Sequence, residues 1–147
     1  MKKEFVPFEL AVKLKELGFD EPCFGYYVDG ELRGINLGIE QLGGIEPYYQ
    51  RFGFHTLSNH NIDNPNKIVV TAPTFSQAFR WFREKHNIDG LLHKTAEGSY
   101  YFWITECEYE NYNHYKYYNQ MVYFNTYEEA ELACLERLIE LVESKSE

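Results

Sequence analysis

Histidine and carboxylate side chains could serve metal or acid-base chemistry in this chain. Two groups combine histidine with aspartate at short spacing: His55, His60 and Asp63, and His86, Asp89 and His93. Imidazole and carboxylate groups are the usual ligands of zinc and related metals. However, no ligand pair lies on one predicted rigid element that would set its geometry. We therefore predict no metal site and no cofactor.

One acid does not fit the apolar pattern around it. Glu131 falls about 40° from Tyr127 on a helical wheel, inside the apolar arc of a predicted helix. An unpaired carboxylate in such a position is costly. One interpretation is that Glu131 benefits from the nearby helix N-terminus and either reaches solvent at the rim or bonds to a tyrosine hydroxyl. The other makes Glu131 a functional acid that acts with a loop histidine in a small, hydrolase-like enzyme.

Nucleotide-binding and nucleophile motifs are missing from the sequence. Gly38 and Gly43 have the spacing of a phosphate loop, but Gly44 and Ile45 stand where Lys and Ser or Thr are needed. Neither G-x-G-x-x-G nor G-x-S-x-G occurs. Motifs therefore indicate no catalytic residue, and an enzyme is the less favoured interpretation.

Tyrosines recur every three residues between two predicted strands, at Tyr109, Tyr112, Tyr115 and Tyr118. In binding loops, tyrosine provides a large contact area with few rotatable bonds. Trp81 lies on the flank of a predicted helix, where it could cover a sheet edge or face a partner. These five residues are candidate partner-binding residues. For the tyrosines, a packed connection between the strands is the alternative.

The C-terminal third of the chain is acidic. Residues 1–94 contain 12 acids and 11 bases, a net charge of −1, whereas residues 95–147 contain 11 acids and 3 bases, a net charge of −8. Phosphate backbones are normally met by clustered Lys and Arg. Single-stranded nucleic acid, which stacks on exposed aromatics, is therefore the third and disfavoured function. The acidity indicates a solvated face or a docking face for a basic partner.

Cysteine content and hydropathy indicate a cytoplasmic protein. The three cysteines contain no C-x-x-C pair, so neither a disulfide framework nor a zinc knuckle is predicted. The sequence shows no signal-peptide run and no stretch of about 20 apolar residues, which predicts no membrane association. A protein partner is a candidate, and a homo-oligomer is left open.

Three helices are predicted from caps and apolar stripes. The first runs from about Pro7 to Leu17 and ends at Gly18. The second runs from about Phe75 to His86, and the third from Tyr127 to about Glu143. The last two begin with capping boxes, in which Thr is followed three residues later by Gln or Glu. The boxes are Thr74 with Gln77 and Thr126 with Glu129.

The predicted strands are rich in β-branched and aromatic residues: a hairpin at 23–33 that turns at Asp29 and Gly30, a short strand at 67–71, and an antiparallel pair at 100–107 and 117–124. Residues 34–66, rich in glycine and turn residues, are predicted as an irregular loop excursion. The order α-β-β-α-β-β-α indicates a single α+β domain over residues 1–147. In it, about three helices pack mainly on one face of one antiparallel sheet.

Three segments form an ordered set: Phe5–Cys23, Ala72–Lys85 and the residues from Thr126 onward. This set resembles small uncharacterised proteins of Bacteroides-type bacteria and their phages or mobile elements. No activity or catalytic residue is established for that group, so the resemblance implies a cytoplasmic bacterial or phage context and transfers no site. The leading hypothesis is a non-enzymatic accessory or protein-binding module of a phage or mobile element.

Overall fold

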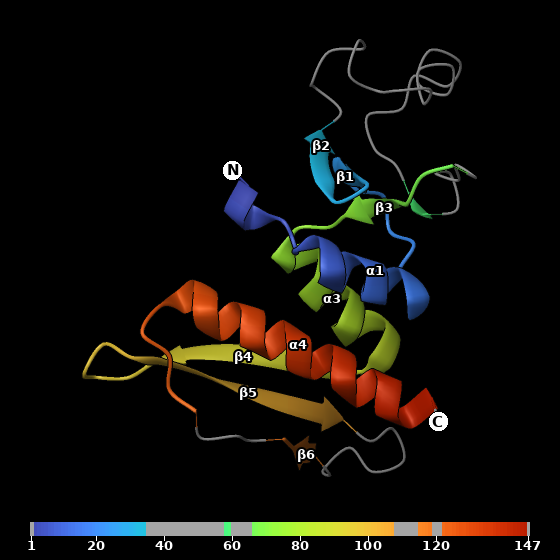
Figure 1. Cartoon of the computed structure of the whole chain (residues 1–147). Helices are drawn as coiled ribbons and strands as arrows, with labels where there is room; N and C mark the ends of the chain where they lie inside the picture. Colours follow the sequence, from blue (N-terminus) through green and yellow to red (C-terminus); the bar gives the residue numbers. More distant parts are fainter. Residues whose placement is uncertain (1, 35–57, 60–65, 108–114, 119–121, 147) are drawn as a thin grey trace. The chain divides into compact units, whose positions relative to one another are not determined.

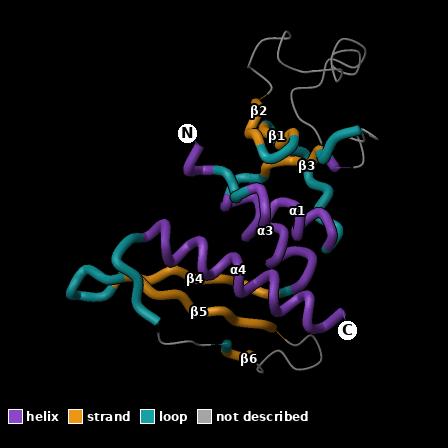
Figure 2. The backbone as a smooth tube through the Cα atoms, in the orientation of Figure 1, coloured by secondary structure: helices purple, strands orange, loops and turns teal. Residues whose placement is uncertain are grey.

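The structure, a computed structural model, describes residues 2–34, 58–59, 66–107, 115–118 and 122–146. The chain divides into two units, Met1–Thr74 and Phe75–Glu147, called here the N-terminal and the C-terminal unit. Figures 1 and 2 show their helices and strands. None of the described helices is long and apolar enough to cross a membrane.

The N-terminal unit consists of helix and a small antiparallel sheet. Its elements are the 3-10 helix Lys2–Glu4, α1 (Phe8–Glu16), β1 (Gly25–Val28), β2 (Glu31–Gly34) and β3 (Val69–Ala72). The strand order is β2-β1-β3, and both pairings are antiparallel. A buried cluster joins α1 to the sheet through Ala11, Tyr27, Val70 and Ala72. Burial of these side chains is what holds the helix on the strands.

Two local predictions in this unit are confirmed. Gly18 has a φ of 91°, and the Phe19 N–H donates to the Leu14 carbonyl at 2.8 Å. The first helix therefore ends in the left-handed conformation that glycine adopts most easily. Asp29 and Gly30 have φ values of 50° and 84°. Both values are positive, as a two-residue hairpin turn of type I′ requires.

Asn59 ties two backbone segments of the N-terminal unit together. Its Nδ2 donates to the Phe19 carbonyl at 2.7 Å, and its Oδ1 accepts from the Thr71 N–H at 3.0 Å. The Asn59 side chain is buried, and backbone groups left unpaired in such a place are costly. Asparagine is a common turn residue, so its local sequence does not reveal this bridging role.

In the C-terminal unit, two helices pack against one face of a second antiparallel sheet. Its elements are α3 (Phe75–His86), β4 (Ile88–Lys94), β5 (Tyr100–Cys107), β6 (Tyr115–Tyr117) and α4 (Tyr127–Ser146). The strand order is β4-β5-β6. As Figure 1 shows, α4 runs along β4 and β5, and α3 packs against β4 and α4. Fully buried side chains between these layers include Ile88, Ile104, Leu135 and Leu138.

The sequence does not predict β4, because Asp89 and Gly90 are residues that strands disfavour. The packing explains the glycine. A Cβ on Gly90 would lie 2.7 Å from Cys134 Sγ and 2.8 Å from Phe79 Cε1. Gly90 thus permits the close approach of α3 and α4 to the sheet. Cys134 is fully buried in this contact, and burial raises the pKa of its thiol, as expected of a core residue.

The predicted antiparallel pairing of 100–107 with 117–124 is confirmed at both ends, but the described strand β6 spans Tyr115–Tyr117 and shares only Tyr117 with the predicted strand. Thr105 pairs with Tyr117, and Tyr100 forms an antiparallel bridge with Phe124. The capping box of α4 is also confirmed. The Glu129 N–H donates to Thr126 Oγ1, and the Thr126 N–H donates to Glu129 Oε2, both at 3.2 Å. Local hydrogen bonding therefore defines where α4 begins.

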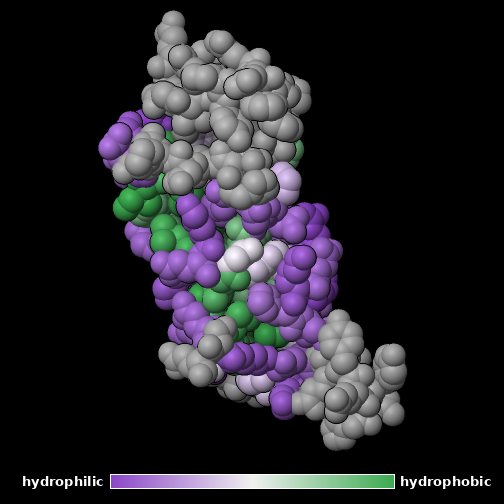
Figure 3. Space-filling view, turned by 90° about the vertical axis from the view of Figure 1, so that its right-hand side faces the viewer, coloured by the Kyte–Doolittle hydropathy of each residue, from purple (hydrophilic) through white to green (hydrophobic). Residues whose placement is uncertain are grey.

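The α+β class and the three α-helices are confirmed, but the prediction of one antiparallel sheet is wrong. The described strands form two three-stranded sheets, one in each unit. Each predicted strand pair has a third strand of its own beside it: β3 pairs with β1, and β4 pairs with β5. That the units act as one domain stays a prediction. On the face drawn in Figure 3, hydrophilic residues surround smaller hydrophobic areas, as suits a mean hydropathy of −0.51.

Candidate functional site

The sheet of the C-terminal unit has one face that carries no helix among the described residues. Side chains alternate between the two faces along each strand. Gly90 faces α3 and α4. Because side chains alternate, Leu91 and His93 both lie on the opposite face of β4. Directly paired residues of neighbouring strands have their side chains on the same face of a sheet. Trp103 pairs with Leu91 and Tyr101 pairs with His93, so both belong to this face as well. We call this surface the open face: Asp89, Leu91, His93, Tyr101, Trp103, Thr105, Tyr117 and Tyr123.

Large side chains of the open face are exposed to solvent. The exposed fractions are 41% for Leu91, 38% for Trp103, 60% for Tyr117 and 57% for Tyr123. With about 200 Å² for each such side chain, the four present on the order of 400 Å². A patch of that size is comparable with the largest exposed apolar patch of a typical monomer, and such patches are often functional.

The rings of the open face contact one another at defined angles. His93 stacks on Tyr101 with centroids 5.1 Å apart and an interplanar angle of 20°. Trp103 is tilted by 53° to His93 and by 55° to Tyr101. Tyr123 meets Tyr101 edge-on, with centroids 6.0 Å apart. Such contacts stabilise a particular arrangement of rings, so the rings of the open face do not lie in one flat plane.

Charge is nearly absent from the open face. Of the described residues that the register places there, Asp89 is the one Asp, Glu, Lys or Arg. Arg83 Nη1 lies 3.4 Å from Asp89 Oδ1 and offsets that charge. This neutrality contrasts with a chain of 23 acids and 14 bases. The open face is thus an uncharged aromatic surface on an acidic protein.

The predicted tyrosine candidates fall in different places. Tyr109 and Tyr112 lie outside the described residues. Tyr115 belongs to β6, where it pairs with Cys107. Tyr118 is half-buried, and its hydroxyl donates to Glu106 Oε2 at 2.7 Å. Tyr118 therefore serves a structural contact.

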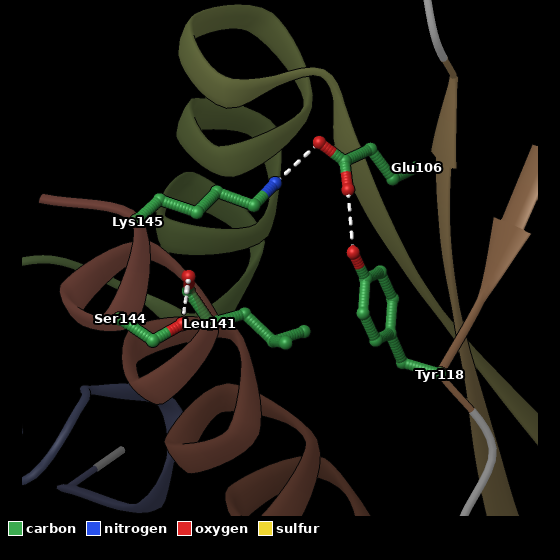
Figure 4. A network of polar contacts seen from close by, with 5 residues as sticks. All are labelled: Glu106, Tyr118, Leu141, Ser144 and Lys145. Carbon is green, nitrogen blue, oxygen red and sulfur yellow. Dashed lines mark hydrogen bonds and ion pairs between the residues drawn. The ribbon is translucent and has the colours of Figure 1, made fainter.

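Figure 4 shows that Tyr118 is part of a polar network at the end of α4. Lys145 Nζ donates to Glu106 Oε1, while Tyr118 donates to the other oxygen of the same carboxylate. Burial by itself raises the pKa of Glu106. The hydrogen bonds from Lys145 and Tyr118, together with the charges of Lys145 and Lys116, more than offset burial and hold this pKa below its usual value. The network thus joins α4, β5 and the residue after β6.

Trp81 does not offer a partner-facing surface. It is only 4% exposed, and it packs edge-on against Phe82 and His86, with centroids 5.0 and 4.6 Å apart. The sequence placed Trp81 on the flank of the helix, where tertiary packing and not periodicity decides exposure. The structure therefore gives no support to Trp81 as a binding residue.

Glu131 is half-buried near the start of α4 and has a tyrosine partner. Burial raises the pKa of Tyr127, and the charge of Glu131 and a hydrogen bond to its carboxylate raise it further. A bond to a tyrosine hydroxyl is one of the two arrangements that the structural interpretation of Glu131 allowed. The catalytic interpretation requires an imidazole that shares a pocket with Glu131.

The described histidines are not gathered around that acid. His86 packs on Trp81 and Phe82, and His93 belongs to the open face. Burial lowers the pKa of His86, and the charge of Lys145 lowers it further. Predicted loop histidines His55 and His60 lie outside the described residues. Within the described ranges, no three His, Cys, Asp or Glu side chains come together as a metal site would require.

A cavity of about 190 Å³ lies along α4, but its lining does not contain the predicted acid or any histidine. Its lining residues are Phe102, Val122, Phe124, Ala133, Glu136, Arg137 and Glu140. Arg137 and Glu140 form an ion pair with each other at 2.8 Å. The cavity therefore brings together no acid-base pair of the kind that the hydrolase-like hypothesis requires.

No protein-family model matches this chain, and searches of curated proteins and of solved structures also find no match. The relationship to small proteins of Bacteroides-type bacteria and their phages therefore stays a prediction. The function has to be argued from the open face itself. Alternation in Tyr101-Phe102-Trp103-Ile104 was the sequence signal for this surface, since every second side chain shares a face.

Proposed function

We propose that the protein is a non-enzymatic accessory module that binds another protein through the open face of its C-terminal unit. The observation that carries the proposal is the exposure of Leu91, Trp103, Tyr117 and Tyr123 on one uncharged sheet face. Tyrosine and tryptophan are enriched in the centres of protein interfaces, from which charged residues are depleted. The open face has this composition.

The other two hypotheses have less support. A hydrolase-like function needs Glu131 and an imidazole in one pocket, whereas the described cavity along α4 contains neither. Binding of single-stranded nucleic acid combines aromatic stacking with a basic groove. Among the described residues that the register places on the open face, none is Lys or Arg, and Arg83 of α3 is paired with Asp89. We place the module in the cytoplasm of a bacterium, as an accessory protein of a phage or mobile element.

The test compares proteins that the full chain and two double variants retain from a Bacteroides lysate. Tyr117→Ser with Tyr123→Ser alters the open face. Phe24→Ser with Ile68→Ser is a matched control, because both residues are 61% exposed and belong to the N-terminal unit. Quantitative mass spectrometry should find a protein that the parent and the control retain and that the open-face variant loses by about tenfold.

In a direct binding assay, that purified protein should bind the parent chain and the control variant equally well and the open-face variant more weakly. Equal retention by both double variants, or the lack of any protein that meets the criterion, would overturn the proposal. Circular dichroism of each variant shows whether the fold is kept. A variant with the parent's spectrum and melting midpoint is suitable for the comparison.

A further inference from the structure

The four most exposed side chains of the open face supply only part of the area that a stable dimer of this chain needs. They present on the order of 400 Å², whereas a stable interface buries about 800 Å² on each partner. The net charge of −9 on each copy adds repulsion between two copies. The area and the charge both favour a short ligand over a second copy of the protein.

The neutrality of the surface restricts the chemistry of that ligand. Among the described residues of this surface, a phosphate backbone finds no cluster of basic residues, and a strongly charged peptide finds no opposite charges beyond the Arg83–Asp89 pair. The ligand should therefore be apolar and uncharged. It should also have hydrogen-bond acceptors, because the exposed Trp103 has an indole N–H donor on its ring.

The arrangement of the rings favours a ridged ligand. Trp103 is tilted by more than 50° to both His93 and Tyr101, and Tyr123 stands at 66° to Tyr101. A stack of bases needs rings with open flat faces. Proline rings, in contrast, project from an extended backbone at regular intervals and dock between aromatic side chains.

We propose that the open face binds a short, uncharged proline-rich segment in the polyproline II conformation. Such a segment has backbone carbonyl groups without internal hydrogen bonds, which can accept from the indole N–H of Trp103. It is also already extended, so little conformational entropy is lost when a small surface binds it. This inference rests on the proposed protein-binding function and specifies the ligand of the same site.

Fluorescence anisotropy of a labelled ten-residue polyproline peptide tests the inference with the full chain. We expect saturable binding to the parent and to the Phe24→Ser, Ile68→Ser control. Tyr117→Ser with Tyr123→Ser should weaken it by about tenfold, as should Trp103→Ser on its own. A Gly-Ser peptide of the same length should not bind.

Absence of polyproline binding to the parent, or equal binding by the open-face variants, would overturn the inference. In that case, open-face-dependent retention of a lysate protein would still support the protein-binding function. Salt-sensitive binding of a ten-nucleotide oligo(dT) that depends on the same residues would overturn both proposals. A dimer that Tyr117→Ser with Tyr123→Ser dissociates in sedimentation would overturn the polyproline inference.

Discussion

Replacement of Gly90 by alanine should destabilise the C-terminal unit. The added Cβ would lie 2.7 Å from Cys134 Sγ and 2.8 Å from Phe79 Cε1, well inside the 3.4 Å at which ordinary contact begins. One or both neighbours would have to move, and both belong to helices packed on the sheet. Overpacking of this kind costs about 1–3 kcal/mol. Alanine also restricts the unfolded chain more than glycine does, which offsets about 0.5–1 kcal/mol of this cost.

The net cost should therefore be about 1–2 kcal/mol. For a unit of roughly 60–100 residues, each 1 kcal/mol lowers the melting midpoint by about 4–8 °C. We therefore expect a decrease of about 5–15 °C for Gly90→Ala. Tryptophan fluorescence reports this unit selectively, because Trp81 and Trp103 are the two tryptophans of the chain.

The control is the same substitution in a variant whose side chains next to Gly90 are smaller. In a chain with Phe79→Leu and Cys134→Ala, both close neighbours are smaller, so Gly90→Ala should cost about half as much or less. A tryptophan melting midpoint for Gly90→Ala within about 2 °C of the parent would refute the close packing of α3 and α4 on β4. Equal costs in the two backgrounds would refute the assignment of Phe79 and Cys134 as the neighbours responsible.

Two further predictions concern polar contacts in each unit. Because the pKa of Glu106 is held below its usual value, its carboxylate adds stability above the unfolded-state pKa, and this stability is lost as pH falls through the folded-state pKa. Glu106→Gln should thus cost about 1 kcal/mol at neutral pH and reduce the drop in tryptophan melting midpoint between about pH 6 and pH 3; an unchanged pH profile would contradict the network. Asn59→Ala should cost the N-terminal unit about 1–3 kcal/mol, since the Phe19 carbonyl and the Thr71 amide lose their partner. Hydrogen exchange should then show a less protected Thr71 amide, and parent-like protection would count against the bridge.

Predictions that depended on a few neighbouring residues agree with the structure. The box of Thr126 and Glu129, the turn at Asp29 and Gly30, and the stop at Gly18 each satisfy backbone groups within about one helical turn or one hairpin. The atoms that decide these features are close in sequence. The residue types within these short segments therefore determine their geometry.

Predictions about the site required contacts between distant residues. The hydroxyl of Tyr118 is held by Glu106, and Trp81 packs inside with His86, although both residues looked available from their spacing. Conversely, Trp103 and Tyr123 belong to the open face, although the sequence did not single them out as binding residues. Exposure is a property of tertiary packing, because a side chain's neighbours come from other elements.

The sequence by itself determined the α+β class, the three α-helices and the local turns of this protein. Only the tertiary structure decided that β4 exists despite Asp89 and Gly90, because the strand depends on close packing of two helices. That packing covers one side of the sheet and leaves the other side to the aromatic residues. The open face therefore arises from register and layer order, which link residues too far apart in the chain for local patterns to specify.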